Sequence, residues 1–359
     1  MPLRSDIRQA RWLLIGLVVI LLVAAGLAVL RATRDRPSEL EQALGLAPRG
    51  ADRYSFTDWA AVRRALDADV DADSSGTQIE RFLSRAFDRD LSPASTLTDS
   101  AVLLQRRLGW SPATLVWELL SQSTKGAVVI GRLPDSVSFD SLRATMRATG
   151  LTAPSHGDVW DGSEALYQVE GSGDGRQVTP LITYVALVPD QHLVITGDDG
   201  DYVQQQVDAL EDTRLDPAIA EVADAIGDPT AAYLYSGDYA CAQLSLADAD
   251  TTDQSQGKEL VAQAGKVNPY DGFALASEPD GTVVAAMAFE SHDQAVTNAD
   301  TRATLAVGPA VGQGGSFTDR FRLGTVNADG PVVRMELHPK ADASILSDLG
   351  NGPLLFATC

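Results

Sequence analysis

Residues 181–196, LITYVALVPDQHLVIT, decide the fold class of this chain. An apolar run reaches the turn dipeptide Pro189–Asp190, and a second apolar run, HLVIT, follows at once. Two such runs joined by a short turn are typical of an antiparallel β-hairpin. The pattern recurs further along, where YDGFALAS (270–277) and TVVAAMAF (282–289) are joined by the turn residues EPDG.

Outward from these hairpins, further strands alternate with segments that have helical apolar spacing. Strands are predicted at 127–133, 164–169, 231–236, 316–323 and 331–337, and helices at 57–66, 79–87, 98–109, 112–121, 139–150, 199–210, 217–226, 255–265 and 292–306. Hairpins separated by helices favour an α+β fold with largely antiparallel sheets. Both halves run strand, helix, hairpin, helix in loose order, so a duplicated α+β unit is one interpretation.

Residues 12–30, WLLIGLVVILLVAAGLAVL, predict a transmembrane helix. The segment carries no charge and would be about 28 Å long, close to the hydrocarbon thickness of a bilayer. Three arginines lie on each side of it, so the positive-inside rule does not set its orientation. We expect an uncleaved signal anchor with the C-terminal domain outside the cytoplasm, because no second apolar span follows. The alternative is a cleaved signal peptide with its cut inside the apolar run.

These patterns divide the chain into five parts. We expect a short cytoplasmic N-terminus (1–11), a transmembrane signal anchor (12–30), a tether (31–50), a helical cap with a first α+β unit (51–228), and a second α+β unit (229–359).

The composition excludes several classes of protein. The 359-residue chain has a formal net charge of −21, which argues against nucleic-acid binding because phosphates need a basic surface. Its two cysteines and four histidines are too few and too scattered for a zinc or iron–sulfur site, so no cofactor is predicted. The chain contains no serine-hydrolase, zinc-protease or phosphate-loop motif, and we expect no enzyme activity.

The acidic segment 67–80, DADVDADSSGTQIE, has the spacing of a calcium loop. Asp69, Asp71, Asp73 and Glu80 occupy positions 1, 3, 5 and 12 of an EF-hand pattern. Position 6 is serine where the pattern needs glycine, and position 8 is glycine where it has an apolar residue. The segment is interpreted either as a calcium site or as a solvated acidic loop.

Cys241 and Cys359 are the only cysteines in the chain. Outside the cytoplasm a cysteine pair tends to oxidise, so we predict a disulfide between them. In the chain-entropy model such a bridge would contribute about 4–5 kcal/mol. The alternative is two unpaired thiols.

Three stretches carry a resemblance to known proteins: YSFTDWAAVRRAL (54–66), SPATLVWELLSQS (111–123) and LPDSVSFDSLRATMRATG (133–150). They resemble uncharacterised single-span, extracytoplasmic envelope proteins of high-GC Gram-positive (actinobacterial) bacteria. The resemblance implies a place in the cell envelope, and it carries over no activity and no site residue.

Together these features predict a membrane-anchored extracytoplasmic protein that acts as a non-catalytic interaction or accessory module. Its expected partners are the membrane and another envelope protein. Two alternatives stay open: a ligand- or calcium-binding sensor-like module that uses the 69–80 loop, and an unrecognised hydrolase.

Overall fold

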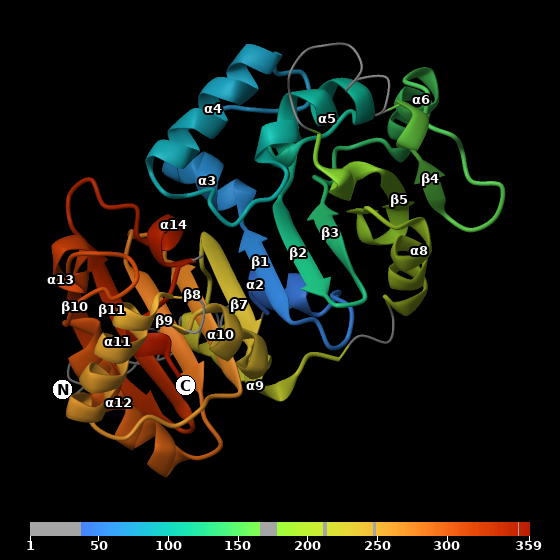
Figure 1. Cartoon of the computed structure of the whole chain (residues 1–359). Coiled ribbons are helices and arrows are strands. Elements are labelled where there is room, and N and C mark those ends of the chain that lie inside the picture. Colours follow the sequence, from blue (N-terminus) through green and yellow to red (C-terminus); the bar gives the residue numbers. More distant parts are fainter. Residues whose placement is uncertain (1–36, 166–177, 211–213, 247–248, 351) are drawn as a thin grey trace, which may run out of the picture. The chain divides into compact units, whose positions relative to one another are not determined.

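The computed structural model describes residues 37–165, 178–210, 214–246, 249–350 and 352–359. Residues Glu39–Cys359 form one compact unit. Its strands join into a single 11-stranded sheet in the order β10-β11-β9-β8-β7-β1-β2-β3-β6-β5-β4, with every neighbouring pair antiparallel (Figure 1). The α+β class is confirmed, and one continuous sheet takes the place of the expected separate sheets.

The elements have the following bounds. The strands are β1 Arg53–Thr57, β2 Trp117–Ser123, β3 Gly126–Arg132, β4 Val159–Asp161, β5 Tyr184–Val188, β6 Leu193–Gly197, β7 Ala231–Ser236, β8 Gly272–Ser277, β9 Val283–Ala288, β10 Phe321–Asp329 and β11 Val332–Pro339. The α-helices are α2 Glu39–Leu44, α3 Trp59–Ala65, α4 Gly76–Asp88, α5 Ala101–Leu108, α6 Phe139–Ala148, α8 Gly200–Ala209, α9 Pro217–Ile226, α10 Gly237–Gln243, α11 Thr251–Ala264, α12 His292–Ala306, α13 Phe317–Arg320 and α14 Ile345–Gly350. Short 3₁₀ turns include η2 Pro112–Thr114 and η5 Leu355–Ala357.

The two halves of the sheet have matching strand orders. From the centre outward, the first half runs β1-β2-β3-β6-β5-β4 and the second runs β7-β8-β9-β11-β10. In each half a central strand is followed by a hairpin, a helix on the crossover, and a second hairpin that returns beside the first. The halves meet where β1 pairs antiparallel with β7.

Helices cover both faces of the sheet. Helices α2, α8 and α9 pack on one face, over side chains such as Phe56, Leu119 and Leu234. The other face carries two separate apolar clusters, one under α3, α4, α5 and α6 and one under α10, α12 and α14. Burial of these apolar faces is the main stabilising contribution to the fold.

A polar stripe separates the two clusters on that second face. It is formed by β1, where Arg53, Ser55 and Thr57 alternate toward the same side and pair in register with β2 and β7. Both hydroxyls are 1% exposed and have no hydrogen-bond partner among the described residues. The Arg53 guanidinium lies 5.6 and 5.8 Å from the ring centres of Tyr233 and Tyr235. The stripe marks the boundary between the two halves.

The hairpins predicted at 181–196 and 270–289 are confirmed as β5–β6 and β8–β9. The helix predicted at 112–121 is wrong, because η2 occupies residues 112–114 and β2 begins at Trp117. Tertiary pairing overrides the local helix preference there. The helix predicted from Thr57 is present as α3, but its N-cap is Asp58, which accepts a hydrogen bond from the Ala61 amide, and Thr57 is the last residue of β1.

Several other boundaries differ from the sequence-based expectations. Residues 163–165 are helical rather than extended, and residues 166–169 of the strand predicted there lie outside the described part of the chain. The strand predicted at 316–323 begins with the short helix α13. The folded unit begins inside the expected tether, because Leu40, Ala43 and Leu44 of α2 are buried in the core.

The predicted anchor at residues 12–30 falls outside the described part of the chain. Within the part that is described, every helix is too short or too polar to span a bilayer.

Candidate functional site

The segment with calcium-loop spacing forms a turn followed by a helix. Asp71 closes that turn, since its Oδ1 accepts hydrogen bonds of 3.0 Å from the Asp73 amide and from the Ser74 hydroxyl. Ser75 then caps α4, so Glu80 lies within the helix. Among the described residues, no three histidine, cysteine, aspartate or glutamate side chains are grouped so that they could hold a metal ion. The structure therefore adds no support for a calcium site at Asp69, Asp71, Asp73 and Glu80.

The predicted disulfide is present. Cys241 at the end of α10 is bonded to Cys359, with the two Cα atoms 5.6 Å apart. The bridge fixes the C-terminal tail, residues 354–359, against the second half of the sheet. The Tyr270 hydroxyl also holds the tail by donating a 2.7 Å hydrogen bond to the Ala357 carbonyl.

Arg302 of α12 is a fully buried cation beside this tail. Its guanidinium donates to the carbonyls of Phe356, Thr358 and Asn268 at 2.7–2.9 Å. It also lies 5.2 Å from the ring centre of Tyr270, a cation–π distance. Burial lowers the pKa of Arg302 to about 10, and Tyr270 opposes that shift. Its contacts are those of a structural clamp that positions the tail.

Glu118 of β2 is a fully buried acid under the cap formed by α3 to α5. Its Oε2 accepts from Trp59 Nε1 at 3.1 Å and from the Ser95 hydroxyl at 2.7 Å, and its Oε1 accepts from the Thr96 amide at 3.0 Å. Burial raises the pKa of Glu118 above the usual range, although these hydrogen bonds oppose the shift. The carboxyl group is enclosed by donors, and it ties the loop of residues 89–97 to the sheet.

That same loop also reaches the second half of the fold. Asp90 accepts hydrogen bonds from the amides of Leu346 and Ser347 at the start of α14, at 2.6 and 3.0 Å. The Tyr233 hydroxyl of β7 donates to the Pro93 carbonyl at 2.6 Å. Burial raises the pKa of Asp90, against the effect of its donors. The loop thus links the cap to the opposite half of the sheet.

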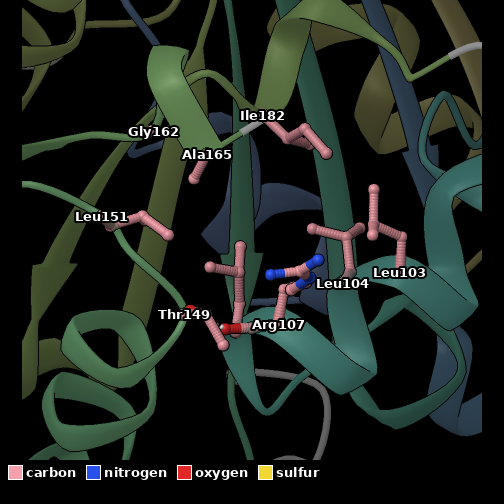
Figure 2. Close-up of a pocket in the computed structure, with 9 residues that line it drawn as sticks. Leu103, Leu104, Arg107, Thr149, Leu151, Gly162, Ala165 and Ile182 are labelled. Carbon is pink, nitrogen blue, oxygen red and sulfur yellow. Dashed lines mark hydrogen bonds between the residues drawn. The ribbon is translucent and has the colours of Figure 1, made fainter. Parts of the chain in front are cut away.

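One pocket lies between α5, α6 and the segment around residue 162 (Figure 2). Leu103, Leu104, Leu151 and Ile182 point into it, and the free space is only about 20 Å³. Such a volume holds about one water molecule. The pocket is therefore a packing gap in the cap and not a site for a ligand.

A larger cleft, of about 400 Å³, lies between α11 and the C-terminal tail. One face of α11 lines it with residues at positions i, i+3, i+4, i+7 and i+8, namely Gln254, Gly257, Lys258, Val261 and Ala262. The facing wall consists of Ser245, Leu246, Leu355, Thr358 and Cys359. The volume lies within the range of about 300–1,000 Å³ that is typical of small-molecule sites.

Gly257 allows α11 to approach the facing wall. A Cβ atom at this position would lie 2.2 Å from Cδ1 of Leu246, so a larger residue would push that leucine aside. Gly257 is also the one residue of α11 whose surface is buried, so this helix packs lightly on the body of the fold. The cleft has a rigid wall, fixed by the disulfide, and a lightly packed one.

None of the cleft residues except Cys359 was singled out from the sequence. The signal that could have indicated them is the five-residue face of α11, which lies mostly within the helix predicted at 255–265. Its partners Leu246 and Leu355 are distant in sequence and are brought to it by the fold.

Comparison with known proteins gives distant structural similarity and no family. No protein-family model and no curated protein matches the chain. The structure of crystal form I of TP0453 is similar with a TM-score of 0.37 and 10% identity, over 86% of this chain and 96% of that one. Crystal form III of TP0453 gives a TM-score of 0.39 and 9% identity, over 85% and 96%. Similarity at this level carries no functional argument.

Proposed function

We propose that this chain is a single-pass membrane protein whose folded unit lies outside the cytoplasm and acts as a non-catalytic interaction or accessory module of the cell envelope. The observation that carries the proposal is the disulfide between Cys241 and Cys359, because such bonds persist in oxidising compartments and are rare in the cytosol. The apolar segment 12–30 supplies the anchor.

The roles of the buried ionisable groups support a non-catalytic module. Glu118 receives hydrogen bonds from the cap, Arg302 donates to the tail carbonyls, and Asp90 caps α14. Each of these groups holds parts of the fold together through contacts within the chain. The alternatives of a calcium sensor and a hydrolase gain no comparable support from the described residues.

The matching strand orders support a finer proposal about architecture. The two halves are a duplicated α+β unit, in which β1, β2, β3, β6 and β5 correspond to β7, β8, β9, β11 and β10. The α3–α5 cap, inserted between β1 and β2, is then an addition to the first copy, where the second copy has α10 and α11.

Labelling of intact cells tests the topology. In Gln263→Cys, an exposed position on α11, a membrane-impermeant maleimide is expected to label the full-length protein without permeabilisation. A matched Ser5→Cys variant is expected to label after permeabilisation alone. The opposite pattern would exclude an extracytoplasmic domain.

In-cell crosslinking tests the role as an interaction module. The full-length protein is expected to crosslink to another envelope protein, which mass spectrometry would identify. Recovery of no envelope partner under conditions in which a known envelope complex is captured would remove the interaction part of the proposal.

A further inference from the structure

The cleft between α11 and the C-terminal tail has the chemistry of a small-ligand site. Its apolar surface comes from Leu246, Val261 and Leu355, on two different walls. A cleft with apolar walls and few polar groups is the usual form of a small-molecule site. The apolar part of an occupant would therefore lie between α11 and the tail.

Lys258 is the one charged side chain among the described residues that line this cleft. Its helical neighbours at i±3 and i±4 are Ser255, Val261, Gln254 and Ala262, all uncharged, so α11 supplies no ion-pair partner. No carboxylate of a described residue forms an ion pair with Lys258. Lys258 can therefore meet an anionic group at the apolar cleft.

We propose that this cleft binds a small apolar monoanion, with the apolar body between α11 and Leu355 and the negative charge at Lys258. The single cation matches one negative charge. The cleft volume of about 400 Å³ matches a body of one or two fused rings or a short alkyl chain. This site is independent of the proposed envelope role.

Calorimetric titration of the full-length protein in nanodiscs tests the site, with 2-naphthoate as the probe and empty nanodiscs as the blank. The expected result is saturable binding of one 2-naphthoate per chain. The neutral analogue 2-naphthamide is expected to bind more weakly, because it lacks the charge that pairs with Lys258.

Two variants with matched controls locate the probe. Lys258→Gln is expected to weaken 2-naphthoate binding about two- to five-fold, as for a partly exposed ion pair, and to leave 2-naphthamide unchanged. Ala262→Trp, at an exposed position on the cleft rim, is expected to weaken both probes more than about ten-fold by filling the space. Lys266→Gln and Gln263→Trp change exposed residues outside the cleft lining and are expected to alter neither.

Three results would overturn the proposal. One is the absence of saturable 2-naphthoate binding below about 1 mM. Another is equal binding by wild type and Ala262→Trp, since the probe would then lie elsewhere. The third is unchanged binding of 2-naphthoate in Lys258→Gln, which would remove the assignment of an anion to this cleft.

Discussion

The substitution Glu118→Gln tests whether the buried acid is required as an acceptor. Two of its donors, the Trp59 indole N–H and the Thr96 amide, have fixed directions and meet different carboxyl oxygens. The hydroxyl of Ser95, in contrast, can rotate to donate or accept. Whichever way a glutamine amide is turned, its NH₂ group therefore faces one of the fixed N–H donors.

This conflict sets the magnitude of the effect. A buried donor left without an acceptor costs about 1–3 kcal/mol, and we expect Glu118→Gln to lower the free energy of unfolding by that amount. Protonated Glu118 avoids the conflict, because its O–H donates to the Ser95 hydroxyl while the same oxygen still accepts from Trp59.

The loss of stability in the glutamine variant, called the deficit below, is expected to depend on pH. Because burial raises the pKa of Glu118, the stabilisation from the protonated acid is present below the ordinary glutamate pKa of 4.5 and is lost as pH rises through the folded-state value. The deficit is therefore expected to be larger at about pH 5 than at about pH 8. Both conditions lie above the isoelectric point near 4.4, which favours solubility.

Urea unfolding of the full-length protein at both pH values measures the deficit. The control is Glu259→Gln on the exposed side of α11, which is expected to change stability by no more than about 0.5 kcal/mol. A Glu118→Gln variant as stable as wild type at about pH 5, or a deficit that grows toward pH 8, would refute the reasoning.

Further substitutions at three links between parts of the fold test their contributions. Replacing Cys241 and Cys359 together by alanine removes the disulfide, which joins residues 118 positions apart. This double variant is expected to lower the free energy of unfolding in urea by about 4–5 kcal/mol. A decrease below about 1 kcal/mol would contradict the loop-entropy model. Asp90→Ala is expected to lower the free energy of unfolding by about 1–3 kcal/mol through lost acceptors at α14. Asp90→Asn tolerates the left-handed backbone at this position (φ 57°) but turns its NH₂ group toward one of the two backbone amide donors, so it is expected to recover only part of that loss in thermal unfolding. Arg302→Met is expected to speed amide hydrogen exchange in residues 354–358, because the tail carbonyls lose their donor; unchanged exchange there would show that the tail is held without Arg302.

The hairpins were predictable from the sequence because their patterns are local. Strands β5, β6, β8 and β9 are short apolar runs on either side of a turn, and turn residues fix their pairing. The disulfide was predictable for a different reason, since the chain holds one cysteine pair.

The central strands were not predictable in the same way. Strand β1 carries Arg53, Ser55 and Thr57 on one side, a pattern typical of a solvated face, and yet that face is buried between the two apolar clusters. Strand β2 places apolar residues at spacings that also suit a helix, and its pairing with β1 and β3 decides its conformation. Short apolar runs leave helix and strand ambiguous until their partners are known.

The burial of individual aromatic residues did not always follow from the apolar pattern of the sequence. Trp59, Trp110, Trp117 and Trp160 are all buried in the core. Phe87 fits the same apolar stripe of α4 as Ile79 and Phe82, but it is 69% exposed, so the stripe extends beyond the buried part of the helix. The periodicity of apolar residues predicts which face of a helix is apolar, and the neighbouring elements decide how much of that face is buried.

The pairing of β1 with β7 has a consequence for symmetry. Both strands hold the first place in the order of their own half, and they pair antiparallel, with Ser55 opposite Tyr233. Under the proposed duplication this contact is isologous, because each copy contributes the same edge strand and both edges become paired. Solenoid repeats, in contrast, join unlike edges and can extend by further copies. Once the two inner strands have paired with each other, neither half has a free inner edge, so a third unit cannot join the sheet through the same contact.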